Sequence, residues 1–387
     1  MRPRLIVPTV LALGLFVGCH RKAVPISYSG ENPSELAWRV LAENSHAALG
    51  GNGRLAWEFW PSRDNVVLEY PKTPTCAPES ESSLVVSGET LLLRIDKLAR
   101  SGLATTPDAT DKTEEIKYNF TLCGSIKERD VFSSAGRVRA FERREDVAFV
   151  DGSMAIKADW CALDGDTCVD DGRLKLSHVN AQDFHCEAIG RQTYCLLAFH
   201  AAFKDAKFPN WFWATWEHRA LVAYAPKPGD TDPGPGMCCH DSFGFTSKGA
   251  PTRQLLDLLS RTGTGEVLTN YRLVGTQASY EEDGLPTLLG NRAFESGFAN
   301  ASSCMTCHSR ATTNDSFESL TFFICPDPDS GHKHPGCPDA KSGTPYAPVG
   351  VPLEHWFFDR NKRTFTQVGF MWGLMKTANL ECPMPTP

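Results

Sequence analysis

The central part of the chain is patterned for β-strands. Residues 193–203 (TYCLLAFHAAF) and 211–218 (WFWATWEH) are apolar runs joined by a polar connection, and each predicts a strand. Both alternating sets of positions in the second run carry large aromatic side chains, so we expect this strand to be buried on both faces. Residues 146–160 alternate on either side of Asp151-Gly152, a pair typical of tight turns, and predict a hairpin.

Helical spacing is limited to a few segments. Apolar positions three and four apart predict a helix over residues 34–42, a short helix over 251–259 and a terminal helix over 365–380. A proline- and glycine-rich stretch at residues 226–236 predicts an exposed loop. Further short apolar runs predict strands at residues 83–87, 91–95 and 267–274.

These elements predict an α+β fold in which strands outnumber helices. We place a strand-rich body at residues 34–285 and a smaller helical segment at residues 286–387. A chain of 387 residues is long enough for one large domain or two modest ones.

The first 18 residues have the form of a secretory signal. A basic start precedes an apolar run that is shorter than the roughly 20 residues of a membrane span. The run ends at Gly18-Cys19, which resembles the lipobox of bacterial lipoproteins, where the signal is cut before a cysteine that becomes lipidated. We therefore expect a lipid anchor at Cys19 and a polar tether over residues 19–33. An ordinary secretory signal with an incidental Cys19 remains the alternative.

Export agrees with the cysteine content. The chain has 14 cysteines, and closely spaced pairs in an exported protein are typical of disulfides. Sequence does not fix the connectivity, but four pairs could close loops: Cys76/Cys123, Cys161/Cys168, Cys186/Cys195 and Cys325/Cys337. The formal net charge of −7 argues against nucleic acid as a partner and is compatible with a basic redox partner protein.

Residues 302–310 (SSCMTCHSR) contain a Cys-x-x-Cys-His motif. In c-type attachment, two cysteine sulfurs add to the haem vinyl groups and the following histidine binds the iron. One helical turn suits this chemistry because it puts both thiols along one edge of the haem and the next side chain beneath the iron. Cys304 and Cys307 would then be the thioether residues and His308 the proximal ligand, with one of the two preceding serines as the N-cap.

Two other interpretations of the motif remain open. Zinc would need a second ligand pair. The candidates for it are Cys238, Cys239, His240, Cys325, His332, His334 and Cys337. A plain disulfide between Cys304 and Cys307 is the simplest alternative. Motif and export together favour haem c, covalently attached, over both.

A sixth iron ligand would decide between electron transfer and the binding of small molecules. Met371 lies on the predicted terminal helix, where core packing is its other interpretation. His200 and His218 lie on the two aromatic strands, where a buried histidine needs a partner. We take His218 and Met371 as the distal candidates, although a hydrogen-bonded core histidine would give the same pattern as His218.

Several segments together resemble the bacterial cytochrome c family, also described as c-type cytochrome domain-containing proteins. The similar pieces are residues 37–67, 198–218, 288–311 and 369–378. The resemblance implies one covalent haem c at Cys304 and Cys307, with His308 on the iron. Glu295, before the motif, and Trp372, near the end of the chain, also match residues of the family pattern. It implies no particular reaction.

The sequence thus predicts an exported, lipid-anchored monohaem c-type cytochrome of the bacterial cell envelope, on the periplasmic or outer-membrane side. It would transfer electrons to or from a redox partner protein, with haem c between the body and the haem-bearing segment at residues 286–387. A haem enzyme of oxidase or peroxidase type is the second hypothesis, because the body is larger than an electron carrier needs. A disulfide-rich structural or binding lipoprotein without haem is the third.

Overall fold

The computed structural model describes most of the chain between residues 32 and 375. The described ranges are 32–46, 54–79, 113–170, 174–189, 192–223, 241–295, 299–320 and 347–375. Outside them lie Cys19 with the signal, most of the tether, the predicted strands at 83–87 and 91–95, the loop at 226–236, and the pair Cys325/Cys337. Within the described ranges, the helices are all too short or too polar to cross a membrane.

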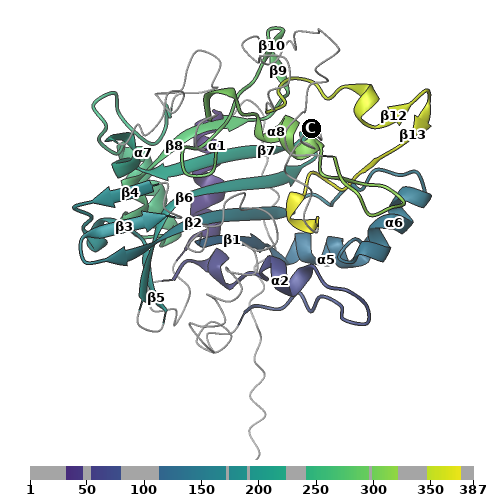
Figure 1. Cartoon of the computed structure of the whole chain (residues 1–387). Coiled ribbons are helices and arrows are strands. Elements are labelled where there is room, and N and C mark those ends of the chain that lie inside the picture. The colour runs from purple at the N-terminus through teal and green to yellow at the C-terminus, as the bar shows by residue number, and fades with distance from the viewer. Residues whose placement is uncertain are drawn as a thin grey trace, which may run out of the picture.

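An eight-stranded antiparallel sheet forms the centre of the molecule (Figure 1). Its order is β4-β3-β2-β6-β7-β8, with β1 also pairing with β2 and β5 with β6. The strands are β1 (Thr113–Tyr118), β2 (Met154–Asp164), β3 (Thr167–Asp170), β4 (Leu174–Ser177), β5 (Cys186–Ile189), β6 (Gln192–Asp205), β7 (Phe208–His218) and β8 (Tyr271–Gln277).

The two aromatic runs of the sequence are the adjacent strands β6 and β7, as predicted. Every residue from Trp211 to His218 is buried, which confirms that β7 is covered on both faces. The strand predicted at residues 267–274 begins only at Tyr271, because Glu266–Asn270 forms a 3-10 turn.

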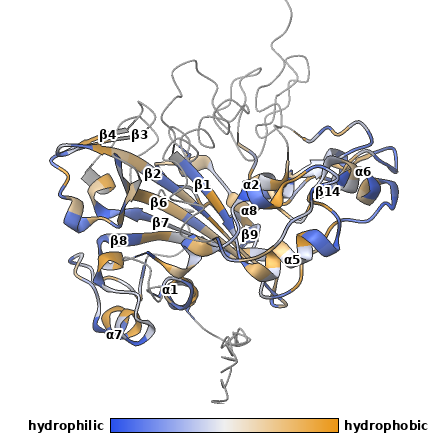
Figure 2. Cartoon of the chain, turned by 90° about the horizontal axis from the view of Figure 1, so that it is seen from below, coloured by the Kyte–Doolittle hydropathy of each residue, from blue (hydrophilic) through white to orange (hydrophobic). Residues whose placement is uncertain are grey.

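Two helices, α1 (Pro33–Asn44) and α7 (Arg253–Thr262), cover one face of the sheet, which we call the helix face (Figure 2). The Asn32 side chain caps the first turn of α1, and the Thr252 side chain caps that of α7. Gly263 ends α7 in the left-handed conformation, with φ 69°. The apolar cluster beneath them includes Trp38, Leu41, Phe199, Trp216, Leu259 and Tyr271.

The opposite face of the sheet, which we call the motif face, is covered by segments from both ends of the chain. Its helices are α2 (Arg63–Val66), α5 (Phe120–Glu128), α6 (Ser134–Glu142) and α8 (Cys304–Ser309). They share one apolar cluster, whose members include Val66, Tyr118, Leu122, Trp213, Leu289, Met305, Val368 and Leu374. Residues before and after position 286 therefore belong to the same hydrophobic core.

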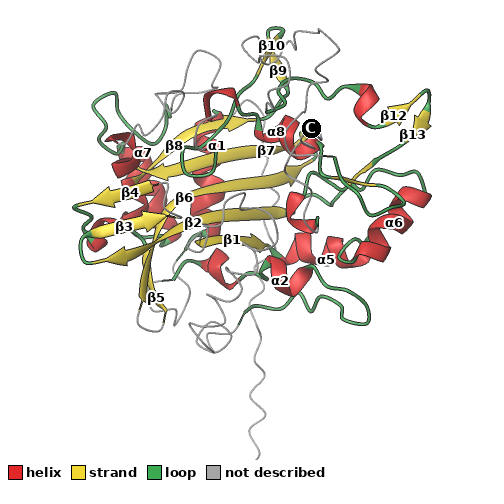
Figure 3. Ribbon diagram, in the orientation of Figure 1, coloured by secondary structure: helices red, strands yellow, loops and turns green. Residues whose placement is uncertain are grey.

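The described part of the segment after residue 286 is not the helical segment that the sequence predicts (Figure 3). Apart from α8 it contains 3-10 turns and the two-residue strands β11 (Thr312–Thr313), β12 (Phe358–Asp359), β13 (Lys362–Arg363) and β14 (Thr366–Gln367). A helix over 365–375 is excluded because Gly369 and Phe370 have φ of 57° and 66°. Only the 3-10 turn Trp372–Leu374 is helical there.

The hairpin predicted at residues 146–160 is also wrong. The turn at Asp151-Gly152 is present, but the residues before it do not pair with β2. Both edges of β2 are already occupied, by β1 on one side and β6 on the other. Val147 instead forms a parallel bridge with Val368, which brings the chain toward the motif face.

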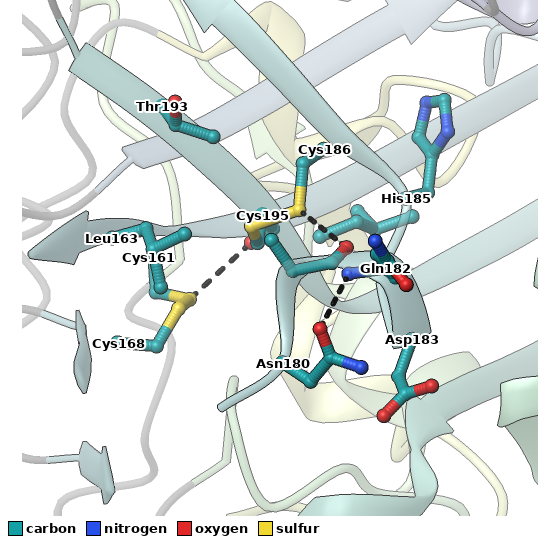
Figure 4. The surroundings of a disulfide bond; sticks show 12 residues. Cys161, Leu163, Cys168, Asn180, Gln182, Asp183, His185, Cys186, Thr193 and Cys195 are labelled. Carbon is teal, nitrogen blue, oxygen red and sulfur yellow. Dashed lines mark hydrogen bonds between the residues drawn. A yellow bond between two sulfur atoms is a disulfide. The ribbon is translucent and has the colours of Figure 1, made fainter. Parts of the chain in front are cut away.

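Three of the four proposed disulfides are present: Cys76–Cys123, Cys161–Cys168 and Cys186–Cys195. The last one joins the paired strands β5 and β6, and Figure 4 shows Cys161 and Cys168 close beside it. Cys161–Cys168 and Cys186–Cys195 lie in a separate apolar cluster of the sheet, whereas Cys76–Cys123 joins α5 on the motif face. The three bonds confirm the prediction that the protein contains disulfides.

Two helical glycines on the motif face should respond in opposite ways to alanine. A methyl group on Gly124, in α5, would meet nothing within 4 Å, whereas one on Gly136, in α6, would lie 1.5 Å from the backbone oxygen of Asp130. We expect Gly124→Ala to raise the free energy of unfolding by about 0.5–1 kcal/mol. Gly136→Ala should lower it by about 2 kcal/mol, because the backbone must move. Urea unfolding of both variants beside the wild type measures this, and equal shifts would contradict the close approach at Gly136.

Candidate functional site

The Cys-x-x-Cys-His motif forms α8, which packs against β7. Ser303 is its N-cap, as predicted for one of the two serines, and its Oγ accepts the amide of Thr306 at 3.3 Å. Gln277, the last residue of β8, accepts the Met305 amide at 2.9 Å and donates its Nε2 to Ser303 Oγ at 2.8 Å. A buried amide side chain at the end of the sheet therefore fixes where the helix begins.

The two thiols of the motif are buried and separate. Cys304 and Cys307 are 8% and 5% exposed and carry no disulfide, although three other pairs in the described ranges are joined. Burial raises the pKa of both thiols, to about 12 for Cys307, so they are protonated at neutral pH. The structure thus offers two intact S–H groups one helical turn apart.

His308 has a defined tautomer. Its Nδ1 lies 2.7 Å from the backbone oxygen of Phe370, and a carbonyl oxygen can only accept, so Nδ1 carries the proton. Burial lowers the pKa of His308 to about 4, which keeps the ring neutral at physiological pH. Nε2 therefore has a free lone pair, and no described residue donates to it. An imidazole held from behind by a carbonyl is the usual arrangement of a metal-binding histidine.

Two tryptophans hold the motif from either side. The ring of Trp213, on β7, lies 4.4 Å from that of His308 between centroids. Trp372, in the 3-10 turn after Phe370, donates its Nε1 to the backbone oxygen of Cys307 at 3.0 Å. The motif is therefore fixed to the sheet by the first contact and to the C-terminal segment by the second.

A row of polar side chains on the sheet faces the motif. Lys157, His200 and Thr215 are cross-strand partners on β2, β6 and β7, so their side chains point to the same face. Asn291 donates its Nδ2 to Thr215 Oγ1 at 2.8 Å, which identifies that face as the motif face. Glu295 lies above the row, with Oε1 3.5 Å from His200 Nε2.

These charged groups are within electrostatic reach of the motif. Burial alone would raise the pKa of Glu295, but His200 and Lys157 outweigh it and hold the pKa low, so Glu295 is a buried carboxylate. Next to burial itself, Glu295 is the main charge that raises the pKa of the two motif thiols. After burial, the positive charge of Lys157 also lowers the pKa of His308, because a nearby cation disfavours the imidazolium.

His218 does not lie with the motif. Its Nε2 is 3.0 Å from the backbone oxygen of Asp183, and its Nδ1 accepts the amide of Ala220 at 3.2 Å, so neither nitrogen is free. Its ring stacks on Phe184 at 3.5 Å and lies 5.1 Å from that of Tyr271, a member of the helix-face cluster. His218 is thus a hydrogen-bonded core histidine, and burial lowers its pKa to about 4.

Met371 does lie near the motif. It is 4% exposed and belongs to the same apolar cluster as Cys304 and Trp213. It directly follows Phe370, whose carbonyl accepts the proton of His308 Nδ1. The backbone of Met371 is therefore on the Nδ1 side of the imidazole, behind the ring and away from its free Nε2.

The remaining sequence candidates lie outside the described residues. They are Cys19, Cys238, Cys239, His240, Cys325, His332, His334 and Cys337. Conversely, the site contains Lys157, which sequence reasoning did not select, and His200, which it considered but passed over for His218. Strand alternation separates the two histidines, because His200 pairs with Thr215 on the motif face whereas His218 pairs with Tyr271.

Comparison of the chain with protein-family models, with curated proteins and with solved structures found no match in any of the three. The similarity to bacterial cytochromes c therefore remains an interpretation of sequence segments. What the site can do has to be inferred from its own residues.

A second buried charge cluster lies near the Cys186–Cys195 disulfide. His185 Nε2 contacts Glu58 Oε1 at 2.9 Å, and Arg54 Nε contacts Glu187 Oε1 at 2.5 Å. Glu58, His185 and Glu187 each place a ligand-type atom within 4.8 Å of the others. The two cationic side chains balance the two carboxylates, so we interpret the cluster as a closed ion network.

Two acid–base groups of this network, Glu187 and His185, have raised pKa values. Burial and the neighbouring Glu58 raise the pKa of Glu187 to about 7, against the opposing effect of Arg54. Burial would lower the pKa of His185, but Glu58 outweighs it and the pKa is raised. The folded state therefore keeps protons on both residues at pH values where the unfolded chain has released them.

The contribution of this network to stability should fall as the pH rises from about 5 to 8, while His218 and His308, whose pKa values burial lowers, act in the opposite direction. For Glu187 the folded pKa of about 7 exceeds the ordinary value of a glutamate, so its contribution is lost as pH rises through 7, at about 1.4 kcal/mol per pH unit at most. His185 acts in the same direction as Glu187. We expect the free energy of unfolding of Glu187→Gln to rise relative to that of the wild type as the pH rises, as measured by urea unfolding at several pH values. Glu145→Gln, at an exposed position, is the control, and identical slopes for wild type and Glu187→Gln would contradict the assignment.

Proposed function

We propose that the protein carries one covalently attached haem c and transfers single electrons. Cys304 and Cys307 would form the two thioether bonds, and His308 would bind the iron. The observation that carries this proposal is the tautomer of His308, whose hydrogen bond to Phe370 leaves the Nε2 lone pair free.

The donor set fits haem c in three respects. The two thiols are intact, lie one helical turn apart and precede the histidine directly. The histidine is neutral, and only a neutral imidazole has a lone pair to give. Its other nitrogen is fixed by a carbonyl, which sets the orientation of the ring. Zinc would need further ligands, and within the described ranges no third and fourth cysteine or histidine joins the motif in a metal-binding group.

Haem iron supplies a one-electron couple, and the protein's residues decide how that couple is used. Cys304 and Cys307 hold the group in a buried place where solvent contributes little. Trp213 packs against the His308 ring and limits its rotation. Glu295 provides a negative charge nearby, and Arg310 and Lys157 provide positive charges, so the surroundings of the motif carry charges of both signs.

Covalent attachment can be tested on protein exported from a host with c-type haem maturation. We expect haem staining to persist on denaturing gels for the wild type and to be lost in Cys304→Ala/Cys307→Ala. Ser309→Ala is the matched control, because Ser309 is buried in the same helix but donates only to the Thr306 oxygen. A wild type that matures well and is colourless would contradict haem attachment and favour a disulfide-rich binding protein.

Export and anchoring belong to the same proposal. Three disulfides within the described ranges are typical of proteins that fold in an oxidising compartment. We place the protein in the bacterial cell envelope, on the periplasmic or outer-membrane side, with its lipid anchor at Cys19. A redox partner protein would exchange electrons with the haem.

The anchor has its own test. We expect Cys19→Ala to move the exported protein from the membrane fraction to the soluble fraction, because a lipidated cysteine would be the attachment to the bilayer. Immunoblots of the two fractions measure this, with Cys19→Ser as a second variant. Unchanged membrane association of both variants would contradict lipidation at Cys19.

A further inference from the structure

His200 has unused hydrogen-bonding capacity in the middle of the motif face. In the described residues its Nδ1 has no hydrogen-bond partner and its Nε2 has only the contact with Glu295 Oε1 at 3.5 Å, although the side chain is only 12% exposed. Phe294 packs on the ring at 4.2 Å between centroids. A buried polar group without a partner is costly, so its presence at this position indicates a ligand that the protein chain does not itself supply.

The strand register puts His200 close to His308. Ala202 pairs with Trp213 and His200 pairs with Thr215, so His200 is the diagonal neighbour of Trp213 on the motif face. Diagonal neighbours on a sheet are about 7–8 Å apart, and the Trp213 ring lies 4.4 Å from that of His308. The two imidazoles therefore approach the same region, one from the sheet and one from α8.

Both histidines are oriented from behind by an oxygen. Phe370 holds Nδ1 of His308, and Glu295 faces Nε2 of His200 at 3.5 Å. Glu295 is itself fixed, because its Oε2 accepts the amide of Asn291 at 2.7 Å. An oxygen acceptor behind the ring orients a metal-binding imidazole and makes it a stronger donor. In His308 the Nε2 lone pair is free, and in a neutral His200 whose proton is on Nε2, toward Glu295, Nδ1 keeps a lone pair.

We propose that His200 is the second axial ligand of the iron and that Glu295 is its positioning residue. The inference rests on the haem attachment proposed above and specifies the ligand set of that site as two imidazoles. A site with both axial positions filled has no place for a substrate on the metal, so the ligand set assigns the protein to electron transfer and not to oxidase or peroxidase chemistry.

The two distal candidates from the sequence are weaker by geometry. His218 uses both nitrogens in hydrogen bonds to backbone groups. The backbone of Met371 directly follows the Phe370 carbonyl, on the Nδ1 side of His308. The two residues serve as controls, since both are buried.

The test uses the full-length exported haem protein. Absorption and electron paramagnetic resonance spectra of the wild type should show six-coordinate low-spin iron with two histidine ligands. We expect His200→Ala to become five-coordinate and high-spin, to gain carbon monoxide binding in the reduced state, and to return to low spin on addition of imidazole. His218→Ala and Met371→Leu should keep the wild-type spectrum. If His200→Ala does not fold, His200→Gln replaces it, and the wild-type resonance spectrum still reports the ligand pair.

The role of Glu295 has a separate readout. We expect Glu295→Gln to remain low-spin with a higher reduction potential than the wild type, because the amide removes a negative charge and makes the imidazole a weaker donor. Exposed Glu145→Gln should leave the potential unchanged. An unchanged potential in Glu295→Gln would contradict the positioning role.

The possible failures are distinguishable. A wild type without haem overturns both the proposed function and this inference. A red wild type that stays low-spin in His200→Ala overturns the ligand assignment alone, and a change in Met371→Leu or His218→Ala would then name the ligand. A red wild type that is already high-spin overturns His200 and would favour a haem enzyme with an open distal site.

Discussion

The hydrogen bond from His308 to the carbonyl of Phe370 joins parts of the chain that are 62 residues apart, and the site depends on it. Without it, a buried N–H would lose its partner and the ring would lose its defined tautomer. Phe370 presents this carbonyl from the left-handed conformation, which costs a non-glycine residue about 1 kcal/mol or more. Gly369 before it has no room for a side chain, since a Cβ would lie 2.2 Å from the Phe149 ring. A strained turn is thus maintained where the motif needs an acceptor.

The second constraint is that β6 and β7 are buried on both faces. Side chains alternate between the two faces of such strands, so successive residues enter two separate cores, one on the helix face and one on the motif face. The apolar cluster around Trp216 lies on the helix face. Both ring nitrogens of His218 form hydrogen bonds with backbone groups. The motif face receives His200, Lys157 and Thr215, and it is there that the C-terminal segment returns. The face on which a histidine lies therefore decides which core it enters.

Local patterns predicted the elements whose formation is local. The caps and apolar spacing of α1 and α7, the two aromatic strands and the two closely spaced disulfides were all accessible from the sequence. The motif with its Ser303 cap was equally local. The terminal helix and the hairpin were wrong for non-local reasons. Contacts with His308 and Phe149 determine the backbone at 369–370, and distant strands occupy both edges of β2.

The choice between the two histidines depends on information that is not local. Sequence alternation places His200 and His218 on their strands, but it does not tell which face will receive α8. That information comes from side chains after residue 286. Ser303 accepts a hydrogen bond from Gln277 at the end of the sheet, and Asn291 donates one to Thr215 on its face. Only the assembled core distinguishes His218, whose two ring nitrogens both have backbone partners, from His200, whose Nδ1 has none in the described residues.

Burial of the motif thiols also bears on whether the proposed haem attachment precedes or follows the packing of the C-terminal segment. A protonated thiol with a pKa raised by burial exchanges slowly with disulfides, because the thiolate is the reactive form. The folded chain therefore protects Cys304 and Cys307 from the three disulfides in its other parts. The same burial would keep a large planar group away from the sulfurs once the core has closed. The haem attachment proposed above would therefore have to take place before the C-terminal segment packs on the motif face.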